Sequence, residues 1–319
     1  MRPGVLVTGA GGFVGSALVR RLVEDGREVM ATYRTPPIEP VPQATQLVIG
    51  ELTEQTDWTA ALQGVEVVVH CAARVHVMKD TAEDPLAAFR AVNVDVTRRL
   101  AEQAAQQGVR RFVYLSSVKA NGEETAPGRP FTGQEEPRPV DPYGQSKLEA
   151  EYALQKVAAQ TGLEVVIIRP VLVYGPGVKA NFRTMMKWLS RGWPLPLGAV
   201  HNRRSLVALD NLVDLIVRCL AHPAATGQVF MASDGEDLSS TELLRRIGSA
   251  LDRRAILLPV PVGVLAMAAR ALGKQAIAQR LCGSLQVDLR HTCETLGWQP
   301  PLSVDEGLRR ATAEFRKSD

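Results

Sequence analysis

The 319-residue sequence predicts an α/β fold: a doubly wound parallel sheet followed by a smaller, mostly helical C-terminal lobe. Apolar runs alternate with amphipathic segments up to residue 170, and the run at 65–73 is almost continuously apolar. Such runs are typical of parallel strands buried on both faces. Beyond Pro170 the alternation ends, and Pro and Gly become dense up to residue 200. We therefore expect residues 1–170, with about 205–220, to form the first lobe, and 171–204 and 221–319 to form the second.

Composition places the chain among ordinary globular proteins, with 45% hydrophobic and 22% charged residues. The formal charge of +3 is spread along the chain, so the charge indicates neither nucleic acid nor an acidic membrane as a partner. The longest apolar stretch, 255–269, is too short to span a bilayer and contains Pro259 and Pro261. We therefore expect no membrane span.

The sequence begins Met1-Arg2-Pro3-Gly4 and runs directly into the first predicted strand, which leaves no room for a secretory signal. Its cysteines, at positions 71, 219, 282 and 293, form no CxxC pair. This pattern predicts reduced packing thiols, no metal site and a cytoplasmic protein.

Three glycines organise the start of the chain. A short strand, 5–8, leads into Gly9, Gly12 and Gly15, and an amphipathic helix follows at 16–25. The first glycine permits a tight turn, the second lets the backbone approach a pyrophosphate, and the third lets helix and strand pack closely. Free N–H groups at the helix start then face the phosphates. The pattern predicts a dinucleotide site with cofactor contacts at Gly9, Gly12, Phe13, Val14 and Gly15. The alternative, a glycine turn without a ligand, is disfavoured by the strand before it and the helix after it.

The remaining elements are expected in the following order. Strands are predicted at 28–34, 45–49, 65–73, 111–117 and 163–169, and helices at 58–64, 85–108, 143–161, 206–220, 240–251, 262–272 and 304–315. The helix at 85–108 ends at a glycine, where a C-cap is expected. A ligand should lie between the lobes, outside the carboxyl ends of the strands.

A second chemical signal is a tyrosine and a lysine four residues apart, Tyr143 and Lys147, at the start of a predicted helix. This spacing places both side chains on one helical face. A phenol is a poor acid or base near neutral pH unless a neighbouring ammonium stabilises its anion. In most sequences, a tyrosine and a lysine at this spacing are simply surface residues of an amphipathic helix. The preceding Ser116-Ser117 and the glycine turn favour a catalytic meaning here.

Several motifs in order give the chain a specific resemblance. They are TGAGGFVG at 8–15, HCAA at 70–73, NV at 93–94, YLSS at 114–117, YGQSK at 143–147, RPVLVYGPG at 169–177 and RSLVALDNL at 204–212. The chain resembles the extended short-chain dehydrogenase/reductase family, which comprises nucleotide-sugar epimerases, dehydratases and reductases, over essentially its whole length. The resemblance implies a Rossmann sheet that binds a nicotinamide cofactor.

The resemblance also implies catalytic roles. Tyr143 would be the general acid/base, Lys147 would lower its pKa and hold the nicotinamide ribose, and Ser117 would hydrogen-bond the substrate oxygen. Ser117 is preferred to Ser116, which we expect to face the sheet. Asn93 would be a supporting catalytic residue. An equally good alternative is that its side chain only hydrogen-bonds to backbone groups inside the helix.

The same resemblance places other residues around the cofactor. Ala72 and Ala73 would line its groove, and Pro170 would shape the nicotinamide pocket. NAD enzymes usually carry an acid at the end of the second strand, where this chain has Tyr33-Arg34-Thr35 and no acid until Glu39. A cation there suits a 2′-phosphate, so NADP(H) is favoured with Arg34 as its contact, and NAD(H) stays open. Arg34 as a solvated loop residue is the plain alternative.

Substrate contacts are expected from the second lobe. Asn181 and Arg204 fall where sugar-nucleotide members of the family hold the pyrophosphate of a UDP- or dTDP-sugar, and Lys119 is a further candidate. Arg203 is an alternative to Arg204. Trp193 and Phe182 are candidates to pack on base or sugar, with a core role as the alternative.

The reaction is narrowed by three features. Dehydratases carry an Asp-Glu pair after the catalytic hydroxyl residue, but Val118-Lys119 stands here. The favoured NADP(H) suits a reductase, and stretches such as DPYGQSKLEAE resemble enzymes of bacterial surface-polysaccharide synthesis. We therefore expect NADPH-dependent reduction of the C4 keto group of a UDP-4-keto-6-deoxy sugar. An NAD-dependent UDP-hexose or UDP-N-acetylhexosamine 4-epimerase is the alternative, and a non-catalytic NADP(H)-binding sensor is a distant one.

The resemblance finally implies a homodimer built from the two long helices. Apolar residues available for such a contact are Ala87, Ala88, Ala91 and Val94 on one helix and Leu148, Tyr152 and Leu154 on the other. The same residues are equally suited to pack on the sheet.

Overall fold

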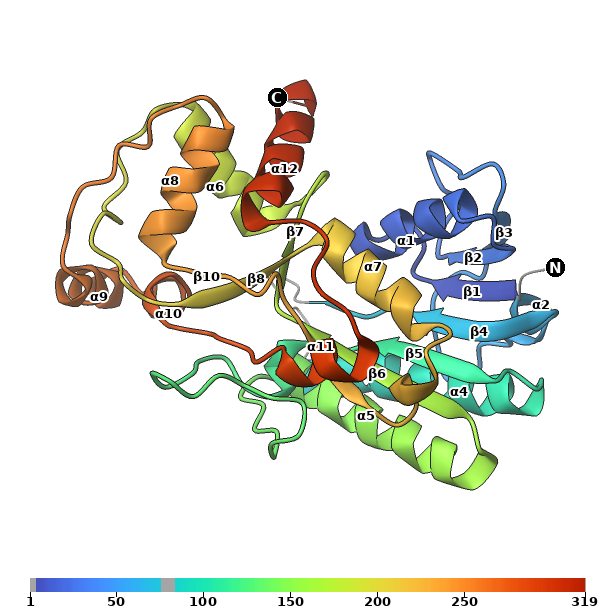
Figure 1. The fold of residues 1–319 in the computed structure, drawn as a ribbon. Helices are drawn as coiled ribbons and strands as arrows, with labels where there is room; N and C mark the ends of the chain where they lie inside the picture. The colour runs from blue at the N-terminus through green and yellow to red at the C-terminus, as the bar shows by residue number, and fades with distance from the viewer. Residues whose placement is uncertain (1–3, 76–83, 319) are drawn as a thin grey trace.

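A seven-stranded parallel sheet forms the centre of the structure (Figure 1). The computed structural model describes residues 4–75 and 84–318. The strands are β1 (Gly4–Thr8), β2 (Val29–Tyr33), β3 (Thr45–Val48), β4 (Val65–His70), β5 (Arg111–Leu115), β6 (Glu164–Pro170) and β9 (Val229–Ala232). They lie in the order β3-β2-β1-β4-β5-β6-β9, and all neighbours pair in parallel. The predicted doubly wound sheet is confirmed. The prediction about a secretory signal concerns residues 1–3, which lie outside the described residues.

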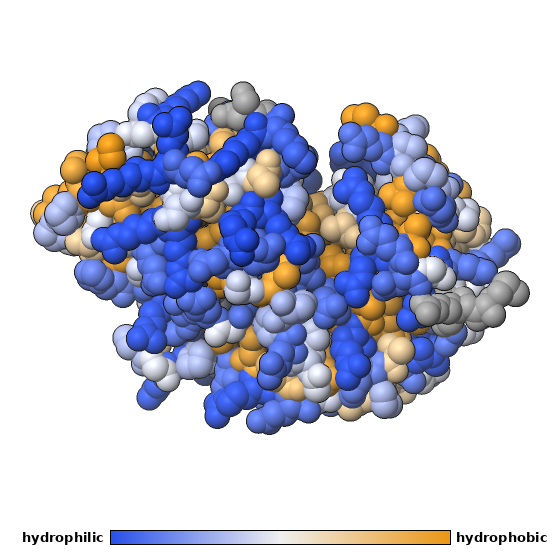
Figure 2. All heavy atoms as spheres, turned by 45° about the horizontal axis from the view of Figure 1, so that its top comes forward, coloured by the Kyte–Doolittle hydropathy of each residue, from blue (hydrophilic) through white to orange (hydrophobic). Residues whose placement is uncertain are grey.

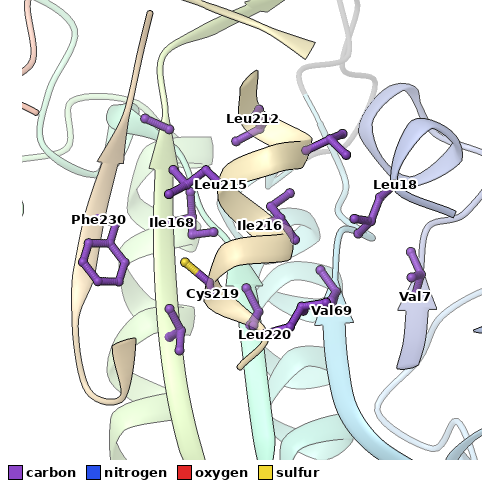
Figure 3. Close-up of a cluster of buried hydrophobic side chains, with 14 of the residues drawn as sticks. Val7, Leu18, Val69, Ile168, Leu212, Leu215, Ile216, Cys219, Leu220 and Phe230 are labelled. Carbon is purple, nitrogen blue, oxygen red and sulfur yellow. The ribbon is translucent and has the colours of Figure 1, made fainter. Parts of the chain in front are cut away.

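Helices cover both faces of this sheet. One face carries α1 (Phe13–Glu24), α7 (Leu209–Cys219) and α11 (Arg290–Leu296), and the other carries α2 (Thr59–Leu62), α4 (Val96–Gln106) and α5 (Pro142–Thr161). On the first face, Figure 3 shows Leu215 of α7 beside Ile168 of β6, while Ile216 lies on the side of α7 nearer Leu18 of α1. Each fully buried side chain of this size stabilises the fold by about 1.5–3 kcal/mol.

The helix predicted at 85–108 is interrupted. It consists of α3 (Pro85–Arg90), a π-helical turn (Ala91–Asp95) and α4. Asp84 caps its start by accepting a hydrogen bond from the Ala87 N–H at 3.0 Å. Gly108, at φ 78°, follows its end as predicted. The π turn was not expected from sequence, because its residues fit a continuous helical pattern.

A second sheet, of three strands, packs with the C-terminal helices and includes residues 205–208, which were expected in the first lobe. Its strands are β7 (Leu172–Tyr174), β8 (Arg204–Ala208) and β10 (Asp237–Leu238), in the order β10-β8-β7. The helices are α6 (Ala180–Ser190), α8 (Ser240–Ala250), α9 (Val262–Ala271), α10 (Gln275–Cys282) and α12 (Val304–Ser318). Those predicted at 240–251, 262–272 and 304–315 are confirmed as α8, α9 and α12.

The prediction of a helix at 206–220 is wrong for its first residues, because the chain forms β8 up to Ala208 before α7 begins. Leu206, Val207 and Ala208 pair in parallel with β7 and are fully or almost fully buried. Their apolar run joins the helical pattern of α7 without a turn residue between them. The sequence therefore offers no visible boundary.

Two late elements return to the central sheet. β9 pairs with β6, and α11 contributes Leu296 to the same buried cluster. The division of the chain into the two predicted lobes stays a prediction. Within the described residues, no helix is long and apolar enough to cross a membrane.

Candidate functional site

The glycine turn joins β1 to α1 at the carboxyl edge of the sheet. Gly9 has φ 67°, and a Cβ there would lie 2.7 Å from the backbone nitrogen of Ala72. A Cβ on Gly15 would overlap the Gly9 carbonyl oxygen. Gly12 caps α1 without a side-chain hydrogen bond, so no side chain occupies the N–H groups of Phe13 and Val14. This turn fits the phosphates of a dinucleotide.

A groove of about 720 Å³ opens beside this turn. Gly11, Gly12 and Phe13 line one end, and the rest of α1 as far as Glu24, with α7 and Arg310 of α12, lines the other walls. Ser117, Tyr143 and Lys147 do not line it. Figure 2 shows the molecule hollowed between the two lobes on this face. The position of a ligand between the lobes stays a prediction.

Ser117 and Tyr143 meet directly after β5. Burial, followed by the charge of Asp141, raises the pKa of Tyr143 to about 12, and the nearby Ser117 hydroxyl opposes this rise. The Ser117 Oγ also accepts a hydrogen bond from the Lys119 N–H at 3.2 Å. Ser116 instead points inward and donates to the buried carboxylate of Glu151. The geometry brings Ser117, not Ser116, to the tyrosine.

Lys147 is buried below Tyr143 on α5. Its Nζ donates to the Leu115 carbonyl at 2.7 Å and lies 4.1 Å from the centre of the Tyr114 ring. Burial lowers the pKa of Lys147 to about 7, against the opposing charge of Glu151. The expected lowering of the Tyr143 pKa by Lys147 is not among the causes at work on that phenol, and it stays a prediction.

Asn93 sits on the π turn and is buried. Its Oδ1 accepts from the Arg74 N–H at 2.8 Å, and its Nδ2 donates to the Arg74 carbonyl at 3.0 Å and to the Ser146 Oγ at 2.9 Å. Ser146 in turn donates to the Tyr143 carbonyl at 2.8 Å. Asn93 therefore ties the loop after β4 to the first turn of α5. Single-turn π-helical segments often occur at functional sites.

The other cofactor candidates lie around the same edge. Ala72 donates its N–H to the Thr8 hydroxyl at 3.3 Å, and Ala73 follows it in the loop after β4. Pro170 ends β6 and is buried beside Ala232 of β9. Arg34 is exposed at the end of β2 and lies 3.6 Å from Glu51.

The substrate candidates are placed differently from one another. Lys119 forms ion pairs with Asp141 and with Glu123, the second at 2.6 Å. Arg204 is largely buried and donates to the Gly283 carbonyl at 3.0 Å, and burial lowers the pKa of its guanidinium despite the charge of Glu124. Asn181 is exposed in the first turn of α6.

The two aromatic candidates differ in burial. Phe182 is buried and stacks on Tyr174, with ring centroids 5.5 Å apart, so it belongs to the core of the second lobe. Trp193 is 50% exposed.

Three charged groups near the site were missed from sequence. Asp141 caps α5 through the Gly144 N–H at 2.6 Å, and hydrogen bonds from Lys119 and Gly144 hold its pKa below the usual range although burial opposes them. Asp-Pro before a helix was a visible capping signal. Glu151, one turn beyond Lys147, forms a buried pair with Arg169. Nothing in the local pattern reveals that pair, because its partners come from α5 and β6.

No group of His, Cys, Asp and Glu within residues 4–75 and 84–318 is placed to hold a metal ion. The cysteines at 71, 219, 282 and 293 are free thiols.

A glycine turn at a helix start, beside a serine, a tyrosine and a lysine, is the arrangement of a dinucleotide-dependent enzyme. The chain belongs to the NAD dependent epimerase/dehydratase family, whose model matches residues 5–232. It is therefore a nicotinamide-dinucleotide-dependent enzyme. The resemblance stated from the sequence is confirmed.

Individual relatives cover the whole chain. A UDP-glucose 4-epimerase of Vibrio cholerae is 44% identical over 100% of this chain and 97% of its own length. The N-acetyl-α-D-glucosaminyl-diphospho-ditrans,octacis-undecaprenol 4-epimerase of Escherichia coli O157:H7 is 28% identical, covering 97% of this chain and 94% of the relative. Among solved structures, MoeE5 in complex with UDP-glucose and NAD is 26% identical with a TM-score of 0.78, over 99% of both chains.

Proposed function

We propose that the protein is a UDP-sugar 4-epimerase that uses NAD. The observation that carries the proposal is the meeting of Ser117 and Tyr143 above Lys147, beside a glycine turn that fits a dinucleotide. The 44% identity to a UDP-glucose 4-epimerase over the whole chain supports this reaction over the reduction favoured from sequence.

In this proposal Tyr143 moves the proton and Ser117 holds the sugar oxygen. Tyr143 takes the proton of the sugar 4-hydroxyl and returns a proton to the same oxygen once the sugar has turned. Ser117 donates a hydrogen bond to the 4-oxygen while it is a carbonyl. A bound nicotinamide would accept the C4 hydride and give it back, so the reaction is redox-neutral overall.

Supporting roles follow from the contacts. Lys147 lies one helical turn from Tyr143 and supplies positive charge beneath the site when it is protonated. Asn93 positions Tyr143 through Ser146 and through the loop that carries Ala72 and Ala73. Gly9, Gly12, Phe13, Val14 and Gly15 cradle the cofactor phosphates, and Pro170 borders the nicotinamide.

The carrier of the sugar is proposed to be UDP. The two named relatives are both 4-epimerases, but one acts on a sugar carried by undecaprenyl diphosphate. The more similar relative and the UDP-glucose complex of MoeE5 favour UDP. Arg204, Asn181 and Lys119 remain the proposed substrate contacts. Of these, Lys119 must leave its pairs with Glu123 and Asp141 to bind a diphosphate.

A second candidate, NADPH-dependent reduction of a UDP-4-keto-6-deoxy sugar, rests on the end of β2. Arg34 stands there instead of an acid, which suits a 2′-phosphate and a cofactor that exchanges at each turnover. Glu51 lies 3.6 Å away and competes for this arginine, which weakens the argument.

One pair of assays separates the candidates. The purified protein is incubated with UDP-glucose or UDP-N-acetylglucosamine, without added reductant, and the products are resolved by NMR. Formation of the 4-epimer supports the proposal. Stoichiometric loss of NADPH absorbance with a UDP-4-keto-6-deoxy-N-acetylhexosamine, without epimer formation, would establish the reductase instead. Absence of turnover in both assays would contradict both reactions and favour the non-catalytic NADP(H)-binding sensor.

A further inference from the structure

Apolar side chains gather on the outer surface of the second lobe. They are Ile256, Leu258, Val264, Met267, Leu272 and Ile277, exposed by 48, 47, 47, 68, 70 and 53% respectively. We call this set the α9 patch. In Figure 2, hydrophobic residues are visible at the end of the molecule where Figure 1 places α9 and α10. Large exposed apolar patches mark interaction surfaces.

The helix at its centre is apolar all round but is not buried. No residue of α9 is fully buried, and its one charged side chain is Arg270. Leu265 contacts the core of the second lobe, while Met267 on the opposite side faces solvent. A helix that is apolar on every side normally lies inside a protein or a membrane. The outward side of α9 therefore lacks its partner.

The chain segment that carries the α9 patch has charges of a single sign. Residues 253–287 contain Arg253, Arg254, Arg270, Lys274 and Arg280 and no Asp or Glu. All five cations are exposed, and none of them forms an ion pair in the part of the chain that the structure describes. Acids do lie beside this segment, and they have partners of their own. Asp252 is paired with Arg316 at 2.7 Å, and Glu124 accepts from Gln279 at 3.2 Å. Glu123, Glu135 and Glu136 line the same pocket as Gln279 and interact with Lys119, Asn121 and Arg138 respectively.

An interfacial aromatic residue lies along the same side. Trp193 is 50% exposed, and the strand-like segment that follows it is hydrogen-bonded to the start of the α9 patch. Leu195 donates to the Ile256 carbonyl at 2.9 Å and accepts from the Leu258 N–H at 2.8 Å. Tryptophan, exposed aliphatic side chains and a basic rim together are typical of surfaces that lie in the headgroup region of a bilayer.

We propose that the α9 patch docks the protein on an anionic membrane surface, with the aliphatic side chains at the acyl boundary and the five cations among acidic headgroups. A second copy of the chain fits less well, because a two-fold contact would bring the same cations face to face. An anionic bilayer satisfies both the apolar and the basic part of the surface.

The test is flotation of the purified protein with lipid vesicles. Wild-type protein is expected to float with phosphatidylcholine vesicles that contain phosphatidylglycerol. Binding should fall at least about tenfold with pure phosphatidylcholine, and it should weaken as salt is raised. Met267→Glu and Leu272→Glu should each reduce binding at least about tenfold, since each places a charge at the acyl boundary. Ile38→Glu, at a site 99% exposed on the other lobe, is the matched control and should bind as wild type.

Circular dichroism and thermal unfolding establish that each variant is folded. The proposal is overturned if the wild-type protein stays with the soluble fraction, or if all three variants float equally. It is also overturned if light scattering shows a wild-type dimer that Met267→Glu converts to a monomer without any vesicle binding. None of these readouts depends on the proposed epimerase activity.

Discussion

Burial shifts the two central groups of the site in opposite directions. It raises the pKa of Tyr143 to about 12 and lowers that of Lys147 to about 7. At a pH between about 7 and about 12, the Tyr143–Lys147 pair holds one titratable proton, which resides on the phenol or on the amine. A tyrosinate beside an ammonium is therefore one proton transfer away from the neutral pair, without any change in total charge.

This proton count predicts the pH dependence of the reaction. Below pH 7 both groups are protonated and the site lacks a proton acceptor. We expect kcat/KM for UDP-sugar oxidation to rise with pH through about 7, as the pair loses its first proton. Initial rates across the neutral range measure this limb. It should vanish in Lys147→Met, and a profile that falls with rising pH would contradict the assignment.

The role of Tyr143 gives a second prediction. Tyr143→Phe removes the hydroxyl that we propose to carry the proton but keeps the ring packed against Phe89, whose centroid lies 5.9 Å away. Turnover should fall about 10²–10⁴-fold, while the dissociation constant for the cofactor changes little. Tyr152→Phe, on the same helix but 53% exposed, is the control and should retain full activity. Retained turnover in Tyr143→Phe would move the acid/base elsewhere.

We propose that cofactor choice depends on Arg34 at the end of β2 and on its pairing with Glu51. Arg34→Ala should lower the preference for NADP(H) over NAD(H) about tenfold, because a charge-assisted contact to a 2′-phosphate is lost. Glu51→Gln should raise that preference, because it frees the arginine from an exposed pair at 3.6 Å. Kd values for both cofactors test this. If neither variant changes their ratio, Arg34 is a solvated loop residue.

At the scale of secondary-structure elements, the sequence predicted correctly those elements that short-range patterns determine. The glycine turn, the buried strands and the helix that carries Tyr143 all have short-range signals, and each stands where it was expected. Contacts between distant segments were not visible. Glu51 meets Arg34 because β3 pairs with β2, and Glu151 meets Arg169 because α5 packs on β6. The π turn at Asn93 likewise depends on partners in the loop after β4 and on α5.

Helix α5 offers a direct comparison of a buried and an exposed ion pair. Glu151 and Arg169 have side chains 1% and 3% exposed, whereas Glu149 and Arg90 are 29% and 45% exposed. Glu151→Gln leaves Arg169 buried without its counter-charge, so the free energy of unfolding should fall by about 3–5 kcal/mol. Glu149→Gln should lower it by less than about 1 kcal/mol.

Urea unfolding measures both variants of α5. Equal losses of unfolding free energy in the two variants would mean that water reaches Arg169 and replaces its lost counter-charge. A second readout separates the electrostatic role from the structural one. Because the charge of Glu151 raises the pKa of Lys147, the kcat/KM limb in Glu151→Gln should move to lower pH, while Glu149→Gln should leave it in place.

Across the whole molecule, the two lobes are joined by backbone hydrogen bonds around residues 283–288. Ser284 and Gln286 accept from Thr125 and Phe131 of the loop after β5, at 2.9 and 2.8 Å. Leu285 accepts from Ser205 of β8 at 2.8 Å. The loop that follows Ser117 and the strand that begins at Arg204 are thus held by one segment. This segment therefore links the loop after the proposed catalytic Ser117 to the strand of the proposed substrate contact Arg204.

The oligomeric state is the remaining question at this scale, and the helices expected to pair are only partly free to do so. Leu148 and Leu154 are buried within the protomer, with Leu154 in the cluster beneath the sheet. Ala87, Ala91 and Tyr152 are exposed, with Tyr152 at 53%. We therefore propose a homodimer through the exposed sides of α3, the π turn and α5, with Tyr152 near its centre.

Tyr152→Glu should convert this dimer to a monomer, because it would bury an unpaired carboxylate in the contact. Light scattering at several protein concentrations measures the mass. Met267→Glu on α9 carries the same charge change on the opposite lobe and should leave the dimer intact. A wild-type monomer would exclude the contact. If Met267→Glu alone dissociated a wild-type dimer, the contact would lie on α9, and the membrane-docking proposal would fail with it.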